Sequence, residues 1–272
     1  MRWTPGDRSN IEDARGASGG IGGVHLGIGG LLVLLVLSWA TGTNFFALLG
    51  GGNASSSGAV GTSGQVQSTP QEEKTIDFVD AVMNDVQRTW QDLLGDRYRP
   101  TRVVIFRDSL SSGCGMAQAA TGPFYCPEDS LVYLDVGFFR ELADRFGAPG
   151  DFAQAYVVAH EVGHHVQHLL GMSGPSVAME LQADCFAGVW GHAASQQGRA
   201  ERGEVQLDPG DAEEGLNAAA AIGDDRLQRM ATGHVQPEKF THGSSAQRVA
   251  AFTRGLDSGR PAACQSTPAT TR

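Results

Sequence analysis

The feature that most constrains this chain is the pentapeptide His-Glu-Val-Gly-His at residues 160–164, which lies inside a stretch with helical periodicity. We predict a helix over residues 151–170. Side chains four residues apart lie on one face of a helix, so His160 and His164 can direct their imidazoles at one point. Two histidines at this spacing are typical of a zinc site, in which the intervening glutamate reaches a metal-bound water.

A catalytic zinc ion takes three protein ligands and keeps a fourth position for water. His168 continues the histidine face, but it lies two turns beyond the first histidine, about 12 Å along the axis, so one ion cannot bind all three histidines. A second helix is predicted over residues 176–197, with Glu180 and Asp184 on one face. We predict Glu180 as the third ligand and Asp184 as the hydrogen-bond acceptor for a ligand histidine. A solvated helix face is the alternative for this pair.

The two predicted helices resemble the gluzincin arrangement, H-E-x-x-H followed by E-x-x-x-D, of thermolysin-like enzymes. More specifically, the chain resembles the bacterial family of putative neutral zinc metallopeptidases over about residues 72–264. The resemblance implies a membrane-tethered zinc peptidase with a zincin-like α+β fold, mainly helical with a small sheet. The stretches that carry it are GPFYCP (122–127), VYLD (132–135), GDFAQAYVVAHEVGHHVQ (150–167), ELQADCFAGVW (180–190), IGDDRL (222–227) and THGSSAQR (241–248).

The last of these stretches carries His242 and Arg248, which open a helix predicted at residues 245–255. Both side chains can steady negative charge on the oxygen of a transition state. With the resemblance, we predict this catalytic role for both. A loop position for His242, beside a helix N-cap, is the alternative.

A short strand is predicted just before the first zinc helix, at Val132, Tyr133, Leu134 and Asp135. In gluzincin-like folds, by resemblance, such an edge strand pairs with the extended substrate. The unpaired N–H and C=O groups of an edge can bind a peptide as an added strand. An ordinary sheet strand is the alternative.

An apolar stretch at residues 24–50 contains no Asp, Glu, Lys or Arg and is long enough to cross a bilayer, which takes about 20 apolar residues. We predict an uncleaved transmembrane helix, with a cleavage site after Ala47 or Ala54 as the alternative. Residues 1–23 are polar and Gly-rich and are predicted to be disordered. Their three arginines favour a cytoplasmic N-terminus, with the main domain outside. Residues 51–70 are typical of a flexible linker.

The folded domain is predicted over residues 71–264, followed by a mobile tail at 265–272. Thr69, Pro70 and Glu72 form a helix-start signature at its beginning. The net charge of the chain is −10, and the charges of the N-terminal segment cancel, so the acidity belongs to the rest. Because no basic stripe is present, we expect no nucleic-acid partner.

Four cysteines, an even number in a domain expected outside the cytoplasm, indicate two disulfides. Three pairings are possible. We predict a local clip between Cys114 and Cys126 and a bond between Cys185 and Cys264 that ties the tail to the second zinc helix. Metal binding by cysteine is the alternative, but the chain has no C-x-x-C spacing.

These features predict a membrane-anchored zinc metallopeptidase with one zinc ion per chain and a protein or peptide substrate. Zinc lowers the pKa of its bound water toward about 7, and Glu161 acts as general base. One alternative is a zinc hydrolase of cell-wall peptides or other amides. Another is a non-catalytic, zinc-stabilised binding module, against which Glu161 argues, because a structural site needs no base and closes with four protein ligands.

Overall fold

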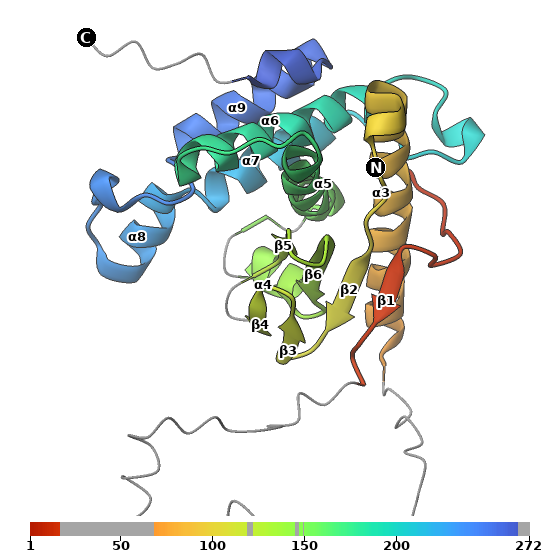
Figure 1. Cartoon of the computed structure of the whole chain (residues 1–272), viewed down its shortest axis with the longest axis horizontal. Coiled ribbons are helices and arrows are strands. Elements are labelled where there is room, and N and C mark those ends of the chain that lie inside the picture. Colours follow the sequence, from red (N-terminus) through yellow and green to blue (C-terminus); the bar gives the residue numbers. More distant parts are fainter. Residues whose placement is uncertain (17–67, 119–121, 145–146, 149, 266–272) are drawn as a thin grey trace, which may run out of the picture. The chain divides into compact units, whose positions relative to one another are not determined.

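The structure is a computed structural model, and part of the chain lies outside what it describes (Figure 1). The transmembrane helix predicted at residues 24–50 lies outside the described residues, as do most of the predicted linker and all but the first residue of the tail. Within the described part of the chain, no helix is both long and apolar enough to cross a membrane. The described residues are 1–16 and 68–265, without 119–121, 145–146 and 149.

Helix α3 (Pro70–Leu94) begins at the start signature read from the sequence. The Thr69 hydroxyl accepts a hydrogen bond from the backbone N–H of Glu72 at 3.2 Å. In return, the Glu72 carboxylate accepts one from the backbone N–H of Thr69 at 2.9 Å. This reciprocal pair is a capping box. The apolar side of α3 is buried, so the helix closes one side of the core.

The strands are β1 (Ile11–Asp13), β2 (Val103–Phe106), β3 (Ser109–Ser112), β4 (Gly115–Gln118), β5 (Phe124–Cys126) and β6 (Leu131–Asp135). The main sheet has the order β1-β2-β6-β5, and β3 and β4 form a separate hairpin. β1, β2 and β6 run parallel, whereas β5 is antiparallel at the edge. The prediction that residues 132–135 form an edge strand is wrong, because β5 pairs with β6 and takes the edge position itself.

Residues 1–16 fold onto the main domain. The composition of residues 1–23 had predicted disorder, and for residues 1–16 this prediction is wrong. β1 pairs with β2, with Ile11 opposite Val103. The Trp3 ring packs edge-on against Phe78 of α3, with ring centroids 5.4 Å apart. The polar residues of this segment have specific partners on α3, which composition alone does not reveal.

The described helices after the sheet are α4 (Phe138–Asp144), α5 (Asp151–Leu169), α6 (Ser176–Ala194), α7 (Asp211–Ala221), α8 (Asp224–Thr232) and α9 (Ser245–Ser258). The two helices predicted to carry the zinc ligands are thus confirmed as α5 and α6. Helix α5 lies between the sheet and the layer formed by α6, α7 and α9 (Figure 1). The fold is therefore mainly helical α+β, with small sheets.

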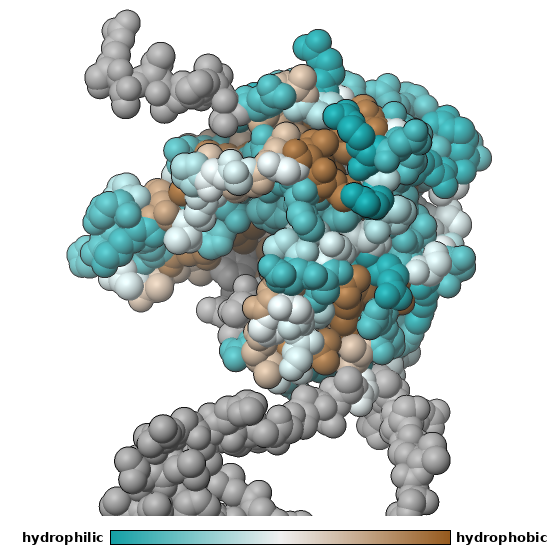
Figure 2. All heavy atoms as spheres, in the orientation of Figure 1, coloured by the Kyte–Doolittle hydropathy of each residue, from teal (hydrophilic) through white to brown (hydrophobic). Residues whose placement is uncertain are grey.

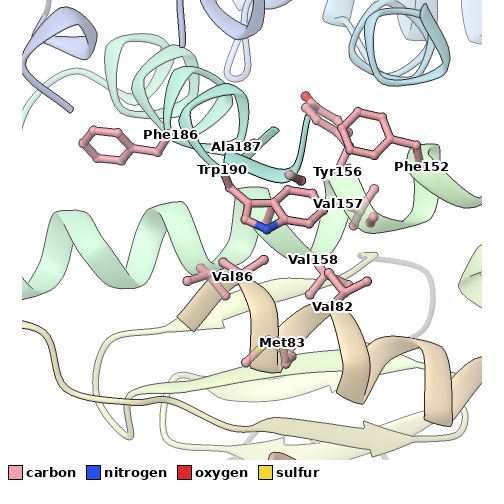
Figure 3. Packing of buried hydrophobic residues seen from close by; sticks show 14 of the residues in the cluster. Val82, Met83, Val86, Phe152, Tyr156, Val157, Val158, Phe186, Ala187 and Trp190 are labelled. Atoms are coloured by element: carbon pink, nitrogen blue, oxygen red, sulfur yellow. The ribbon is translucent and has the colours of Figure 1, made fainter. Parts of the chain in front are cut away.

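The core between α3, α5 and α6 is built from large apolar side chains (Figure 3). Trp190 of α6 stacks on Phe152 of α5, with ring centroids 5.7 Å apart and planes at 20°. Its indole N–H donates to the buried carboxylate of Asp85 on α3 at 2.8 Å. These contacts hold the three helices together and thereby fix the direction in which α5 presents its other face.

One disulfide is local and the other is long-range, and both predicted pairings are confirmed. Cys114–Cys126 connects the β3–β4 hairpin to the edge strand β5. Cys185–Cys264 connects the middle of α6 to the end of the described chain. Helices α6 and α9 also approach closely, since a Cβ at Gly255 would overlap the carbonyl oxygen of Cys185.

Candidate metal centre

The three predicted ligands converge where α5 crosses α6. Nε2 of His160 lies 3.2 Å from one carboxylate oxygen of Glu180, and Nε2 of His164 lies 3.4 Å from the other. Each of the three residues offers one ligand atom, and these three atoms lie within 4.8 Å of one another. The crossing is close because Gly163 has no side chain, and a Cβ there would lie 3.0 Å from the carbonyl oxygen of Ala183.

The hydrogen bonds of the two histidines leave Nε2 of each ring for a metal. Nδ1 of His160 lies 2.9 Å from the Asp184 carboxylate, which when ionised can only accept a hydrogen bond. Nδ1 of His164 lies 2.9 Å from the side-chain carbonyl oxygen of Gln167, whose amide group donates to the Met179 carbonyl. Both rings therefore carry their proton on Nδ1 when neutral and turn an unprotonated Nε2 toward Glu180. Two imidazole nitrogens and a carboxylate are the ligand set of an open zinc site, so the residues fit that metal.

Asp184 is fully buried and is the centre of a charged network behind the ligands. Besides the imidazole of His160, it accepts hydrogen bonds from the Tyr156 hydroxyl and from Nε and Nη2 of Arg248, at 2.9 and 2.8 Å. Burial alone would raise the pKa of Asp184, but the Arg248 charge and the His160 hydrogen bond lower it to about 2. The carboxylate is therefore ionised and holds His160 in one orientation.

The charges around the ligands shift their proton affinities in opposite directions. Burial alone would lower the pKa of His160, but hydrogen bonds and charge from Asp184 and Glu180 raise it to about 10. Burial alone would raise the pKa of Glu180, but hydrogen bonds from His160 and His164 hold it well below its ordinary value. Without a metal, the site therefore holds a proton between the His160 ring and two carboxylates.

Glu161 lies beside the three ligands and lines the same cavity. Its side chain is buried, and burial raises the pKa of the carboxyl, while the positive charges of His160 and His164 act against this rise. The backbone of Tyr125 on β5 acts in the same direction on this pKa. The edge strand and the glutamate of the motif thus line the same cavity.

A cavity of about 780 Å³ opens in front of these residues, and on the face shown in Figure 2 the surface is hollowed between α8 and the sheet. One wall is β5 with the residues before it, and the opposite wall comes from α6, α8 and the loop before α9. The volume is that of a site for a sizeable ligand. Apolar side chains supply much of the lining, including Phe124, Phe138, Val157, Met179, Ile222 and Leu227.

His242 and Arg248, predicted from the sequence, both line this cavity but differ in their partners. His242 is 49% exposed, and its Nδ1 lies 3.1 Å from one oxygen of Asp224. The other oxygen of Asp224 accepts backbone N–H groups of residues 241–243, at 2.7 to 3.1 Å. Arg248 is buried, and its guanidinium is engaged by Asp184, Tyr156 and the carbonyl of Ile222. Of the two, only His242 presents its ring at the cavity with solvent access.

Sequence reasoning missed four residues that hold the site together. Tyr156 and Gln167 lie one turn before His160 and one turn after His164, so helical spacing alone could have identified them. Asp224 and Tyr125 lie in stretches that carry the family resemblance, but nothing in their spacing connects them to the motif. His168 lies apart from the ligands, with its Nδ1 2.7 Å from the Tyr125 hydroxyl.

Comparison with known proteins finds relatives that are more than 40% identical to this chain over the matched residues. No solved structure matches it. It is 43% identical to the uncharacterized protein YpfJ of Escherichia coli (strain K12) over 298 residues, which cover 98% of each chain. It is 44% identical to the uncharacterized protein Rv2575 of Mycobacterium tuberculosis (strain H37Rv) over 201 residues, 68% of each chain. The sequence model of the putative neutral zinc metallopeptidase family matches residues 1–175 and 172–267, so the chain belongs to this family.

Proposed function

We propose that this protein is a zinc-dependent metallopeptidase that hydrolyses peptide bonds in proteins or peptides, with one zinc ion per chain. The observation that carries the proposal is the convergence of two Nε2 atoms and a carboxylate at the wall of a cavity that Glu161 also lines. A purely structural zinc site would have four protein ligands and no need of an open cavity. His160, His164 and Glu180 would hold the metal.

The residues around the metal divide the chemistry between them. A bound zinc ion supplies a Lewis acid and makes a neighbouring water acidic. Glu161 takes a proton from the attacking water and delivers it to the leaving amine, for which its raised pKa suits it. Asp184 orients the His160 ring, and Arg248 acts through Asp184. His242, steadied by Asp224, stabilises negative charge on the carbonyl oxygen of the substrate.

The edge strand β5 gives the substrate a place to bind. β5 pairs with β6 on one side only and lines the cavity with Phe124 and Tyr125. An extended peptide can add to such an edge through main-chain hydrogen bonds. Two disulfides favour a location outside the cytoplasm, and attachment to a membrane through residues 24–50 is part of the proposal.

The proposal is tested with the full chain, as wild type beside Glu161→Gln. Both are expected to bind one zinc ion, because Glu161 is not a ligand. Casein hydrolysis is expected in the wild type, with loss to a chelator, and should fall by at least about 10²-fold in the variant. Zinc in both chains with equal hydrolysis would show that Glu161 is not the general base. Absence of zinc from both chains would contradict the proposed metal site.

The role proposed for His242 has its own test. His242→Ala is expected to lower kcat by about 10²-fold, as loss of an oxyanion donor does, with zinc content and KM little changed. Asp224→Asn should lower kcat less, because it leaves the imidazole present but less well oriented. A His242→Ala chain with wild-type kcat would show that the ring is only part of the loop.

A further inference from the structure

The first sixteen residues supply the hydrogen-bond donors of a buried charge on α3. Asp80 has no exposed surface. One of its oxygens accepts the backbone N–H of Arg8 at 2.9 Å, and the other accepts the backbone N–H and side-chain amide of Asn10 at 3.3 and 3.2 Å. On α3 itself, Asn84 adds one further donor. A buried carboxylate without its donors is strongly unfavourable, so α3 is built to receive this segment.

The same segment is also paired through its backbone. The N–H of Val103 donates to the carbonyl of Asn10 at 2.8 Å, and the N–H of Ala14 donates to the carbonyl of Ile105 at 2.8 Å. Ile11 packs against the main core. Arg8 adds ion pairs with Glu73 and Asp77 at 2.6 and 2.7 Å. Backbone pairing, apolar packing and charge thus all attach the segment at one place in the fold.

The residues on either side of the segment 17–67 lie next to each other. Arg15 is buried, and its guanidinium binds Asp13 and Glu73 at 2.6 and 2.9 Å. A third donor of the same guanidinium reaches the hydroxyl of Ser68 at 2.7 Å. Because Ser68 directly precedes the cap of α3, one side chain ties together the two ends between which residues 17–67 run.

From this we infer that residues 1–16 and 68–265 lie on the same side of the membrane, so that the chain between them crosses it an even number of times, zero included. Strand pairing and buried hydrogen bonds cannot form across a bilayer, whose apolar core is about 30 Å thick. A single crossing between Gly16 and Ser68 would place β1 and β2 in different compartments. The inference does not depend on the proposed peptidase activity.

This inference replaces the topology that the sequence favoured. Residues 16–71 contain no Asp, Glu, Lys or Arg, and the apolar stretch at 24–50 within them suits one crossing. The orientation was read from three arginines in the N-terminal segment. Two of these, Arg8 and Arg15, are bound to carboxylates of α3 and β1. Their charges therefore serve the fold, which weakens their use as a topology signal.

The test uses cysteines at Glu12 and Arg102, whose exposed side chains form an ion pair at 3.0 Å between β1 and the residue before β2. All four native cysteines are in disulfides, so the introduced thiols are unique. The full chain carries both substitutions, Glu12→Cys and Arg102→Cys, with a protease site inserted between residues 57 and 58. Intact cells are treated with a short bismaleimide, and the chain is then solubilised, cut and run on a denaturing gel.

We expect the cut double variant to keep the mass of the whole chain, whereas either single variant loses its first segment on cutting. The matched control pairs Glu12→Cys with Arg229→Cys on α8, which lies far from β1 in Figure 1 and should not cross-link. A membrane-impermeant maleimide should also label positions 12 and 102 from the same side. Labelling from opposite sides, or a double variant that loses its first segment like the single ones, would overturn the inference.

Discussion

At His160, the protonation state that the neighbouring carboxylates favour differs from the one that a metal requires. Its ring lies between Asp184 on Nδ1 and Glu180 on Nε2, and both carboxylates favour the protonated ring. A metal needs the opposite state, with Nε2 unprotonated. The two carboxylates that orient the ring for zinc therefore also hold a proton that zinc must displace.

The affinity of the metal-free chain for zinc is accordingly expected to rise with pH between about 6 and 9. The pKa of His160 is raised from 6.5 to about 10, so over this range zinc binding releases about one proton and affinity gains about tenfold per pH unit. In the metal-free fold, the same shift adds stability below pH 6.5 that is lost as the pH rises through 10. Competition with a chromophoric chelator at several pH values measures the slope.

Asp184→Asn is the control for this prediction. It removes one of the two carboxylates, so His160 should lose its proton at lower pH and the slope should flatten toward pH 9. Absolute affinity should also fall by about 10- to 100-fold, as is usual when the partner of a ligand histidine is lost. An affinity that does not change with pH in the wild type would contradict the proton held at His160.

At the scale of elements, the crossing of α5 and α6 determines the geometry of the metal site. α5 carries two ligands and α6 the third, and the crossing distance is set where Gly163 meets the backbone of Ala183. Gly163 is a variable position of the H-E-x-x-H pattern, yet it decides how closely Glu180 approaches the histidines. The spacing of a motif on one helix says nothing about such a partner.

Gly163→Ala is expected to push α5 and α6 apart. Its Cβ would lie 3.0 and 3.1 Å from the carbonyl oxygen and Cα of Ala183, closer than side chains normally pack. Overpacking of this kind costs about 1–3 kcal/mol, and here it also weakens the hold on zinc. Thermal unfolding and zinc titration measure the two effects.

A second variant shows where the strain arises. Adding Ala183→Gly to Gly163→Ala should restore little, because the nearest atoms of residue 183 belong to its backbone. Wild-type zinc affinity in the single variant would mean that the crossing can relax without moving Glu180.

The sequence predicts those parts of this arrangement that depend on residues close together in the chain. The helical spacing of His160 and His164, the helix cap at Thr69 and the two disulfide pairings were all predicted, since each rests on local spacing or on few possible pairings. The sheet edge was not, because a strand pattern does not reveal its neighbours. The contact between Asp224 and His242 was not predicted either, because the two residues are 18 positions apart and only the turn after α8 brings them together.

At the scale of the whole molecule, the N-terminal segment is expected to contribute to stability. Asn10 donates to Asp80 and to Asn84 and accepts from Gln87 at 2.7 Å. Asn10→Ala removes these three side-chain hydrogen bonds from a largely buried setting, while the backbone N–H of residue 10 still donates to Asp80, and the expected cost is about 1–3 kcal/mol. Thermal unfolding of the full chain measures it.

Ser9→Ala is the matched control, because the neighbouring Ser9 side chain is exposed, and its effect should stay within about 0.5 kcal/mol. Equal unfolding of the two variants would mean that the segment is not docked in solution.

The pairing of β1 with β2 also has a consequence for the order of events during synthesis. The first strand to leave the ribosome has its partner at Val103, and its buried acceptor at Asp80, still to be made. β1 must therefore wait unpaired until the chain has been made as far as β2. A polar, Gly-rich segment does so without aggregating, whereas an apolar strand with open edges would seek other partners. The composition that reads as disorder thus suits a strand that is made first and placed late.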